Sequence, residues 1–103
     1  MIALTKQQLE AIHELCHAFE VLKLELFGSG ARDDFDPERS DIDILVEYMP
    51  DIDLGPWISR FFELQERLEM VLGRKVDLVM ASALQNPHLV RSINQDRHVL
   101  YAA

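Results

Sequence analysis

The stretch Asp41-Ile42-Asp43-Ile44-Leu45-Val46-Glu47 decides how this chain folds. Side chains alternate between the two faces of a β-strand, so Asp41 and Asp43 share one face, roughly 7 Å apart along the backbone. The opposite face is apolar and consists of Ile42, Ile44 and Val46. Two neighbouring carboxylates repel each other unless a cation lies between them or one is protonated. Proteins usually hold Mg²⁺ with one or two carboxylates plus substrate phosphates. The doublet therefore predicts a strand that carries a divalent-metal site.

A second strand-like stretch, residues 22–27, runs directly into Gly28-Ser29. Glycine lets the backbone approach a ligand closely, and a helix that starts there offers free N–H groups and a favourable dipole to an anion. The sequence therefore predicts a short helix after this pair and a phosphate cradle made by Gly28 and Ser29. The Ser29 hydroxyl would add a hydrogen bond to a phosphate oxygen. The alternative is that Ser29 is an ordinary helix N-cap.

A third carboxylate lies in a comparable place, in a strand predicted after the turn at Gly73. Asp77 would point to one face of that strand, while the other face would carry Val76, Leu78 and Met80. If this strand pairs beside the Asp41 strand, Asp77 joins the two earlier aspartates. Three carboxylates around one or two metal ions suit phosphoryl-type transfer, because the ions neutralise phosphate charge and align the attacking and leaving oxygens.

Three separated motifs together resemble the minimal nucleotidyltransferases of the DNA polymerase beta superfamily. They are Phe27-Gly28-Ser29-Gly30-Ala31-Arg32, Ser40-Asp41-Ile42-Asp43-Ile44-Leu45-Val46 and Gly73-Arg74-Lys75-Val76-Asp77-Leu78-Val79. The resemblance runs from about residue 5 to the C-terminus, and its specificity comes from three motifs that fall in order with suitable spacing. One position departs from the family pattern, because Asp33 stands where the family usually has glycine.

The resemblance implies roles for individual residues. Gly28 and Ser29 would hold the nucleotide triphosphate. Metal binding and catalysis would fall to three carboxylates, Asp41, Asp43 and Asp77. The last of these would also help to deprotonate the attacking group. Arg32 would either neutralise phosphate charge or form a structural salt bridge.

Apolar periodicity predicts two main helices, over residues 5–20 and from Pro56 to Gly73. Thr5 and Gln8 form a capping box at the start of the first helix. A shorter helix is predicted from Asn86-Pro87, and strands are predicted over residues 22–27, 41–47, 76–80 and 99–101. These elements predict one domain, residues 1–103, of the α/β (α+β) class. We expect a small mixed sheet with helices packed on it, which by resemblance is the nucleotidyltransferase, polymerase beta palm-like, fold.

The composition excludes several classes of protein. A net charge of −8 argues against a surface for a DNA duplex, which is bound by clustered Lys and Arg. Cys16 is the single cysteine, so neither a disulfide framework nor a zinc motif is predicted, and its place on an apolar helix stripe indicates a core residue. No apolar run approaches the length of a membrane span and no signal peptide opens the chain, so the expected location is the cytoplasm.

We therefore expect a Mg²⁺-dependent nucleotidyltransferase that uses a nucleoside triphosphate, ATP by preference, and releases pyrophosphate. By resemblance, chains of this size are antitoxins whose partner is a HEPN-domain ribonuclease, and the reaction transfers AMP to a tyrosine of that toxin. One alternative is a module with a vestigial nucleotide site that neutralises its partner by sequestration, which the negative charge of Asp33 favours. Another is a subunit of a drug-modifying nucleotidyltransferase. A homo-oligomer is compatible with the sequence.

Overall fold

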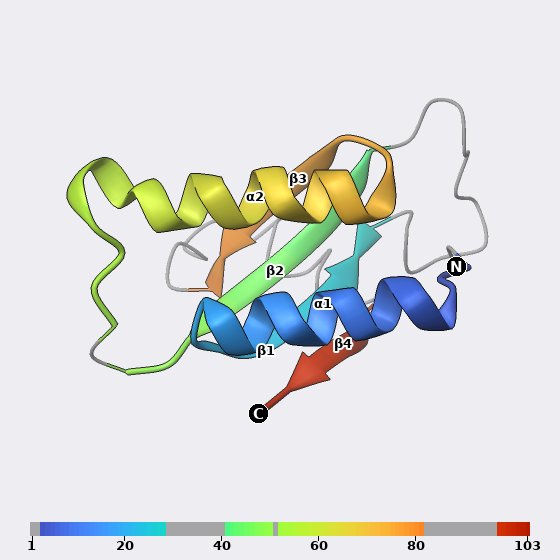
Figure 1. Ribbon diagram of the computed structural model, residues 1–103, viewed down its shortest axis with the longest axis horizontal. Coiled ribbons are helices and arrows are strands. Elements are labelled where there is room, and N and C mark those ends of the chain that lie inside the picture. Colours follow the sequence, from blue (N-terminus) through green and yellow to red (C-terminus); the bar gives the residue numbers. More distant parts are fainter. Residues whose placement is uncertain (1–2, 29–40, 51, 82–96) are drawn as a thin grey trace.

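The computed structural model describes residues 3–28, 41–50, 52–81 and 97–103 (Figure 1). In this part of the chain two helices pack against one face of a four-stranded sheet. The sequence-predicted helices that follow Gly28 and begin at Asn86 lie outside the described residues. No helix within the described ranges is long and apolar enough to cross a membrane.

Helix α1 (Lys6–Ala18) begins at the capping box that the sequence predicts. The Thr5 side chain accepts a hydrogen bond from the Gln8 backbone N–H, and the Gln8 side chain accepts one from the Thr5 N–H, which satisfies two donors that a helix start leaves unpaired. Ile12 and Cys16 are fully buried on its inner face, so the prediction of a core cysteine is confirmed.

The sheet contains β1 (Val21–Phe27), β2 (Ile42–Tyr48), β3 (Val76–Met80) and β4 (His98–Ala102), in the order β3-β2-β1-β4. Strand β1 is antiparallel to both of its neighbours, whereas β2 and β3 are parallel. A parallel pair needs a crossover connection, which α2 supplies. All four predicted strands are confirmed within two residues at each end, and the mixed sheet with helices on it is confirmed as well.

Helix α2 (Ser59–Leu72) starts three residues later than predicted. Pro56 begins a short 3-10 turn, η2 (Pro56–Ile58), and Ile58 has φ 49°, so the α-helix proper begins only after it. The end is as predicted, because Gly73 takes the left-handed conformation (φ 69°) that closes many helices. The inward-facing residues are the predicted ones: Phe61, Leu64, Leu68 and Leu72.

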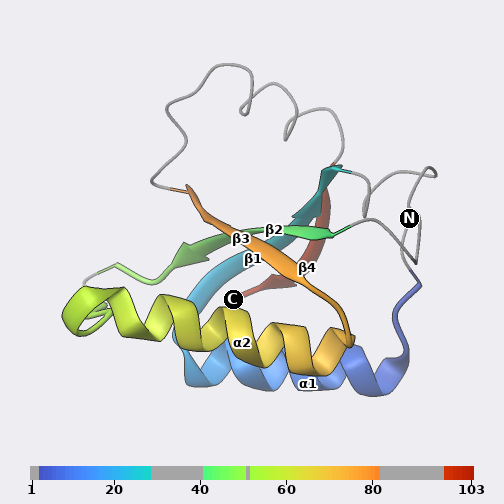
Figure 2. The same ribbon diagram turned by 90° about the horizontal axis from the view of Figure 1, so that it is seen from above.

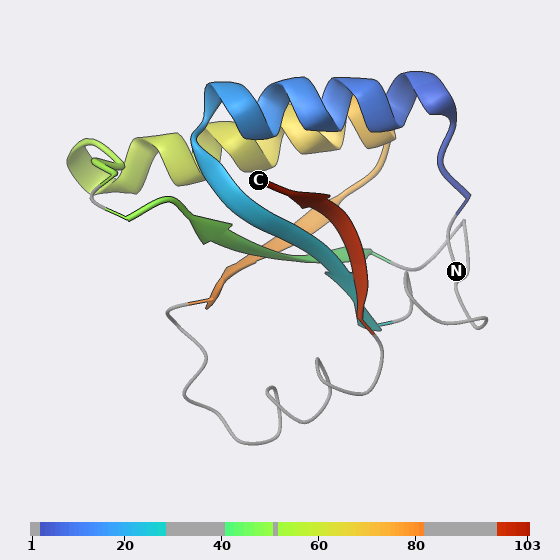
Figure 3. The ribbon, with the colours of Figure 1, turned by 90° about the horizontal axis from the view of Figure 1, so that it is seen from below.

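The two faces of the sheet differ in what covers them. Figures 2 and 3 show α1 and α2 side by side on one face. That face carries the main core, with inward strand residues from all four strands: Val21, Leu24, Leu26, Ile42, Ile44, Val46, Val76, Leu78 and Leu100. The opposite face has a smaller apolar cluster, Phe27 and Leu45 with Val79 and Ala81 beside them. Polar side chains of β1, β2 and β3 alternate with this smaller cluster, and the candidate site lies among them.

Candidate functional site

Strand register brings two of the three predicted carboxylates level with each other. Asp43 on β2 is the partner of Asp77 on the parallel strand β3, and of Phe27 on β1. Neighbouring strands lie about 4.8 Å apart and directly paired residues share a face, so Asp43 and Asp77 point to the same side. Asp41 precedes β2 by one residue and shares that side by alternation. The conditional prediction that β3 pairs beside β2 is therefore confirmed.

The carboxylate of Asp43 packs directly on the backbone of Gly28. Gly28 is buried with φ 66°, and a Cβ built on it would lie 2.5 Å from Oδ2 of Asp43. Any residue other than glycine would displace that carboxylate, and would also adopt a left-handed backbone that L-residues disfavour. The predicted cradle glycine and the predicted metal ligand are thus in contact, although they are fifteen positions apart in the sequence.

The backbone of Asp77 is positioned by α2. The N–H of Val76 donates to a carboxylate oxygen of Glu69 at 3.0 Å, and the side-chain amide of Gln65 donates to the Val76 carbonyl at 2.9 Å. These two partly buried bonds fix the first residue of β3 and hence the strand that presents Asp77. The sequence reasoning did not identify Glu69 or Gln65. Nothing in their helical spacing marks them, since their role depends on how α2 packs against β3.

Asp41 has a positive neighbour. The Lys75 ammonium lies 4.0 Å from Oδ2 of Asp41, and both side chains are at least half exposed. Exposed ion pairs contribute little to stability because water and salt screen them. The pair does balance the charge of one member of the aspartate doublet while leaving it accessible to solvent.

The donor set at this point suits a hard divalent cation. The carboxylates of Asp41 and Asp43 lie on one face and offer the oxygen ligands that such an ion prefers, and the carboxylate of Asp43 covers the backbone of Gly28. Among the described residues, no three Asp, Glu, His or Cys side chains gather tightly enough to form a three-ligand site. Two carboxylates are sufficient for Mg²⁺ when phosphates complete its shell.

A cluster that the sequence reasoning missed lies on the same face at β1 and β4. Glu25 is 4% exposed, and Arg97 donates to both of its oxygens, from Nε at 2.9 Å and from a terminal nitrogen at 2.6 Å. Lys23 lies 3.5 Å from the same carboxylate. Burial raises the pKa of Glu25, but the hydrogen bonds and charge of Arg97, with those of Lys23, outweigh it and hold that pKa below its ordinary range. Glu25 is therefore ionised at neutral pH.

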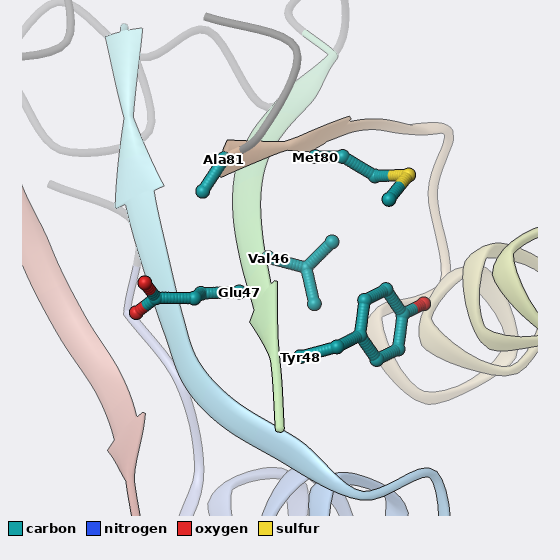
Figure 4. Close-up of a pocket in the computed structure, with 5 residues that line it drawn as sticks. All are labelled: Val46, Glu47, Tyr48, Met80 and Ala81. Atoms are coloured by element: carbon teal, nitrogen blue, oxygen red, sulfur yellow. The ribbon is translucent and has the colours of Figure 1, made fainter. Parts of the chain in front are cut away.

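A cavity of about 310 Å³ lies towards the C-terminal ends of β2 and β3, away from Asp41 and Asp43. It is lined by Val46, Glu47, Tyr48, Met80 and Ala81, none of which is a predicted site residue. Figure 4 shows Glu47 and Ala81 pointing one way and the other three side chains pointing the opposite way. The Tyr48 hydroxyl is buried without a hydrogen-bond partner, and desolvation raises the pKa of Tyr48 to about 12.

Of the predicted residues that the structure describes, Gly28 contacts Asp43, Asp43 pairs with Asp77, and Asp41 lies on the same face of the sheet. Ser29 and Arg32 lie outside the described residues, so their predicted contacts with phosphate stay predictions.

Comparison with known proteins points to one family. Residues 9–100 match the family described as a nucleotidyltransferase domain. The chain is 41% identical over 91 residues to the protein adenylyltransferase MntA of Thermococcus cleftensis, covering 84% of this chain and 87% of that protein.

Solved structures agree on the fold. A toxin–antitoxin crystal structure with AMP-PNP superposes with a TM-score of 0.69 at 24% identity, over 92% of this chain and 73% of that one. A complex of a tri-AMPylated Shewanella oneidensis HEPN toxin with its MNT antitoxin gives a TM-score of 0.65 at 22% identity, over 97% and 74%. At these identities the likeness establishes the fold alone.

Proposed function

Because the chain belongs to the nucleotidyltransferase family, we propose that it transfers AMP from ATP, with Mg²⁺, to a protein acceptor. The observation that carries this proposal is the contact of Asp43 with Gly28, in register with Asp77. The carboxylate that we propose as a metal ligand thus lies against the glycine that we propose receives the phosphates. The chain is an enzyme of the nucleotidyltransferase class, and the finer assignment of donor, metal and acceptor is what we propose.

Each residue of the site has a distinct task in this proposal. Asp41 and Asp43 hold the Mg²⁺, which when bound neutralises phosphate charge and aligns the attacking and leaving oxygens. Gly28 and Ser29 receive the phosphates, and Arg32 adds positive charge to them. Asp77 is the third carboxylate. It is exposed and lies on β3, beside Asp43 on β2.

Asp77 acts on the acceptor. As the acceptor hydroxyl forms its bond to the α-phosphorus, its proton passes to the Asp77 carboxylate. The bond from the α-phosphorus to the bridging oxygen then breaks, and pyrophosphate leaves. The products are the AMP ester of the acceptor and pyrophosphate, so atoms and charge balance. A carboxylate within reach of the nucleophile can serve as general base, and a bound metal would assist it by making the hydroxyl more acidic.

The proposed acceptor is a tyrosine of a HEPN-domain toxin, which makes this chain an antitoxin. Support comes from the name of the Thermococcus cleftensis relative and from the AMPylated toxin in the Shewanella oneidensis complex. The charge of −8 favours a protein partner with a basic face over DNA. In this proposal the protein works in the cytoplasm, with the toxin encoded beside it.

The test uses the chain, the co-expressed neighbouring gene product, Mg²⁺ and ATP labelled at its α-phosphate. We expect label on the partner with the natural chain and none with Asp43→Asn. Glu47→Gln is the matched control, because it removes a carboxylate from the same strand and face at the far end from Gly28. Loss of label in the control but not in Asp43→Asn would contradict the site.

Sequestration is the second candidate function. It is favoured by Asp33, which adds negative charge next to the phosphate motif in the sequence. The same variants separate the two functions. If Asp43→Asn still neutralises the partner without labelling it, sequestration is the mechanism. If neutralisation and labelling are lost together, the mechanism is AMP transfer.

A further inference from the structure

The three carboxylates of the proposed site are sequence neighbours of two buried residues, Ile42 and Val76. Asp41 and Asp43 flank Ile42, and Asp77 directly follows Val76. Ile42 and Val76 pair with each other across the parallel strands β2 and β3, and neither is exposed to solvent. The place of Asp77 relative to the other two carboxylates therefore depends on how Val76 is held beside Ile42.

Strand β3 has a strand neighbour on one side only, since it lies at the edge of the described sheet. An edge strand presents backbone N–H and C=O groups that no neighbouring strand binds. On the β2 side the Ile42 N–H donates to the Lys75 carbonyl at 3.0 Å. On the other side both backbone groups of Val76 bond to α2, whose Gln65 donates to the carbonyl and whose Glu69 accepts from the N–H. Side chains of α2 thus take the place of a further strand at the start of β3.

Glu69 binds both ends of the turn that connects α2 to β3. Its backbone carbonyl accepts the Gly73 N–H at 2.8 Å, and its carboxylate accepts the Val76 N–H at 3.0 Å. Gly73 ends the helix and Val76 begins the strand. Gln65 lies four residues before Glu69 and so on the same side of α2. One side chain of the helix therefore fixes where the turn ends and where the backbone that carries Asp77 begins.

We propose that Glu69 is a positioning residue of the site: by holding the Val76 N–H, it sets the place of the Asp77 carboxylate beside Asp43. This inference rests on the proposed function, in which Asp77 takes the proton of the acceptor hydroxyl. A proton passes only between groups within hydrogen-bond reach, and a misplacement of about 1 Å can lower a rate about a hundredfold. Glu69 is thereby given a role in the transfer step, although it lies on the helix that covers the other face of the sheet.

The test measures two quantities for each variant: the rate of label transfer from ATP to the co-expressed partner at saturating ATP with Mg²⁺, and the calorimetric affinity for ATP with Mg²⁺. Glu69→Ala should lower the rate at least about tenfold and leave ATP affinity within about twofold, because Gly28 and Asp43 lie on β1 and β2. Glu69→Gln should transfer within about threefold of the natural rate, because its amide oxygen can still accept the Val76 N–H.

Glu66→Ala is the matched control, since Glu66 is exposed on the same helix, and it should leave both quantities unchanged. All rates are measured below the melting temperature of each variant. If Glu69→Ala does not fold, Glu69→Asp takes its place. Its carboxylate keeps the charge but is one methylene shorter, so it should either lose the Val76 N–H or draw β3 towards α2. The expected result is again a slower transfer with ATP affinity kept.

Three outcomes would overturn the role of Glu69. A natural rate in Glu69→Ala, or in Glu69→Asp where that variant is used, would mean that the bond to Val76 does not place Asp77. Equal losses of rate and ATP affinity would mean that Glu69 supports the whole domain. A rate in Glu69→Gln as low as in Glu69→Ala would mean that the accepted hydrogen bond is not what matters. Failure of the proposed function looks different, because then Asp77→Asn would transfer label at the natural rate, or the natural chain would transfer none.

Discussion

Replacing Gly28 by alanine tests the contact on which the proposed site rests. The added methyl group would lie 2.5 Å from Oδ2 of Asp43, closer than such atoms can approach. Alanine would also have to adopt a φ near 66°, in the left-handed region. Gly73 is the matched control, because it has φ 69° and no atom within 4 Å of an added Cβ.

The two variants differ in one physical effect. Left-handed alanine costs about 1–2 kcal/mol in both. Gly28→Ala must in addition push the Asp43 side chain out of its preferred rotamer, which costs about 0.5–1.5 kcal/mol more. We therefore expect Gly28→Ala to melt several degrees below Gly73→Ala, since about 1 kcal/mol shifts the melting temperature of a domain this size by about 4–8 °C. Binding of ATP with Mg²⁺ should be lost in Gly28→Ala and kept in Gly73→Ala.

A double variant isolates the contact between Gly28 and Asp43. Asp43→Ala removes the crowded carboxylate, so Gly28→Ala in that background should cost no more than Gly73→Ala does. Thermal and urea unfolding of the variants measure these differences, and calorimetry measures nucleotide binding. The reasoning is refuted if Gly28→Ala and Gly73→Ala cost the same in the natural background and both bind ATP normally.

Three further predictions follow from single side chains. Tyr48→Phe should leave the free energy of unfolding unchanged or raise it by about 1 kcal/mol in urea titrations, because it removes a buried hydroxyl without a partner; a large loss would mean that the hydroxyl is bonded. Asp41→Asn should change unfolding by less than about 0.5 kcal/mol, since its pair with Lys75 is exposed, yet abolish Mg²⁺-dependent ATP binding by calorimetry. Glu25 has a pKa below its ordinary 4.5, so its contribution to stability is present above that pH and is lost as pH falls through the lower folded value. Glu25→Gln should therefore show a shallower fall in melting temperature below pH 4.5, and identical slopes would contradict this.

Much of the fold follows from local sequence signals. Three signals each act over a few residues: the capping box at Thr5, the glycine after α2 and the alternation in residues 41–47. The structure has the corresponding helix start, helix end and strand where they were predicted. The aspartate doublet was found by the same alternation. The start of α2 was wrong by three residues because Pro56 fits a 3-10 turn as well as the first turn of an α-helix. Strand order was not predictable, since it depends on contacts between distant segments.

The burial of Glu25 shows most clearly what could not be predicted from the sequence. Alternation in β1 places Glu25 and Lys23 on the face opposite the main core, and such a face is ordinarily solvated. Glu25 is buried because β4 pairs with β1 and brings Arg97 to it, 72 residues further along the chain. No local sequence pattern around Glu25 or Arg97 predicts that these two residues form an ion pair. The site residues found from sequence are those whose partners are near in sequence or follow a known motif, and the ones missed depend on tertiary pairing.

The charges of this face also bear on the order in which ligands bind. If the nucleotide phosphates bind beside Gly28 as proposed, a chain of net charge −8 with two neighbouring aspartates repels them there when no metal is bound. A divalent ion held by Asp41 and Asp43 would remove that repulsion. ATP affinity should therefore depend steeply on Mg²⁺, and the weak binding that remains in its absence should strengthen as added salt screens the repulsion. Metal-free ATP binding as tight as binding with Mg²⁺ would contradict this account of the charges.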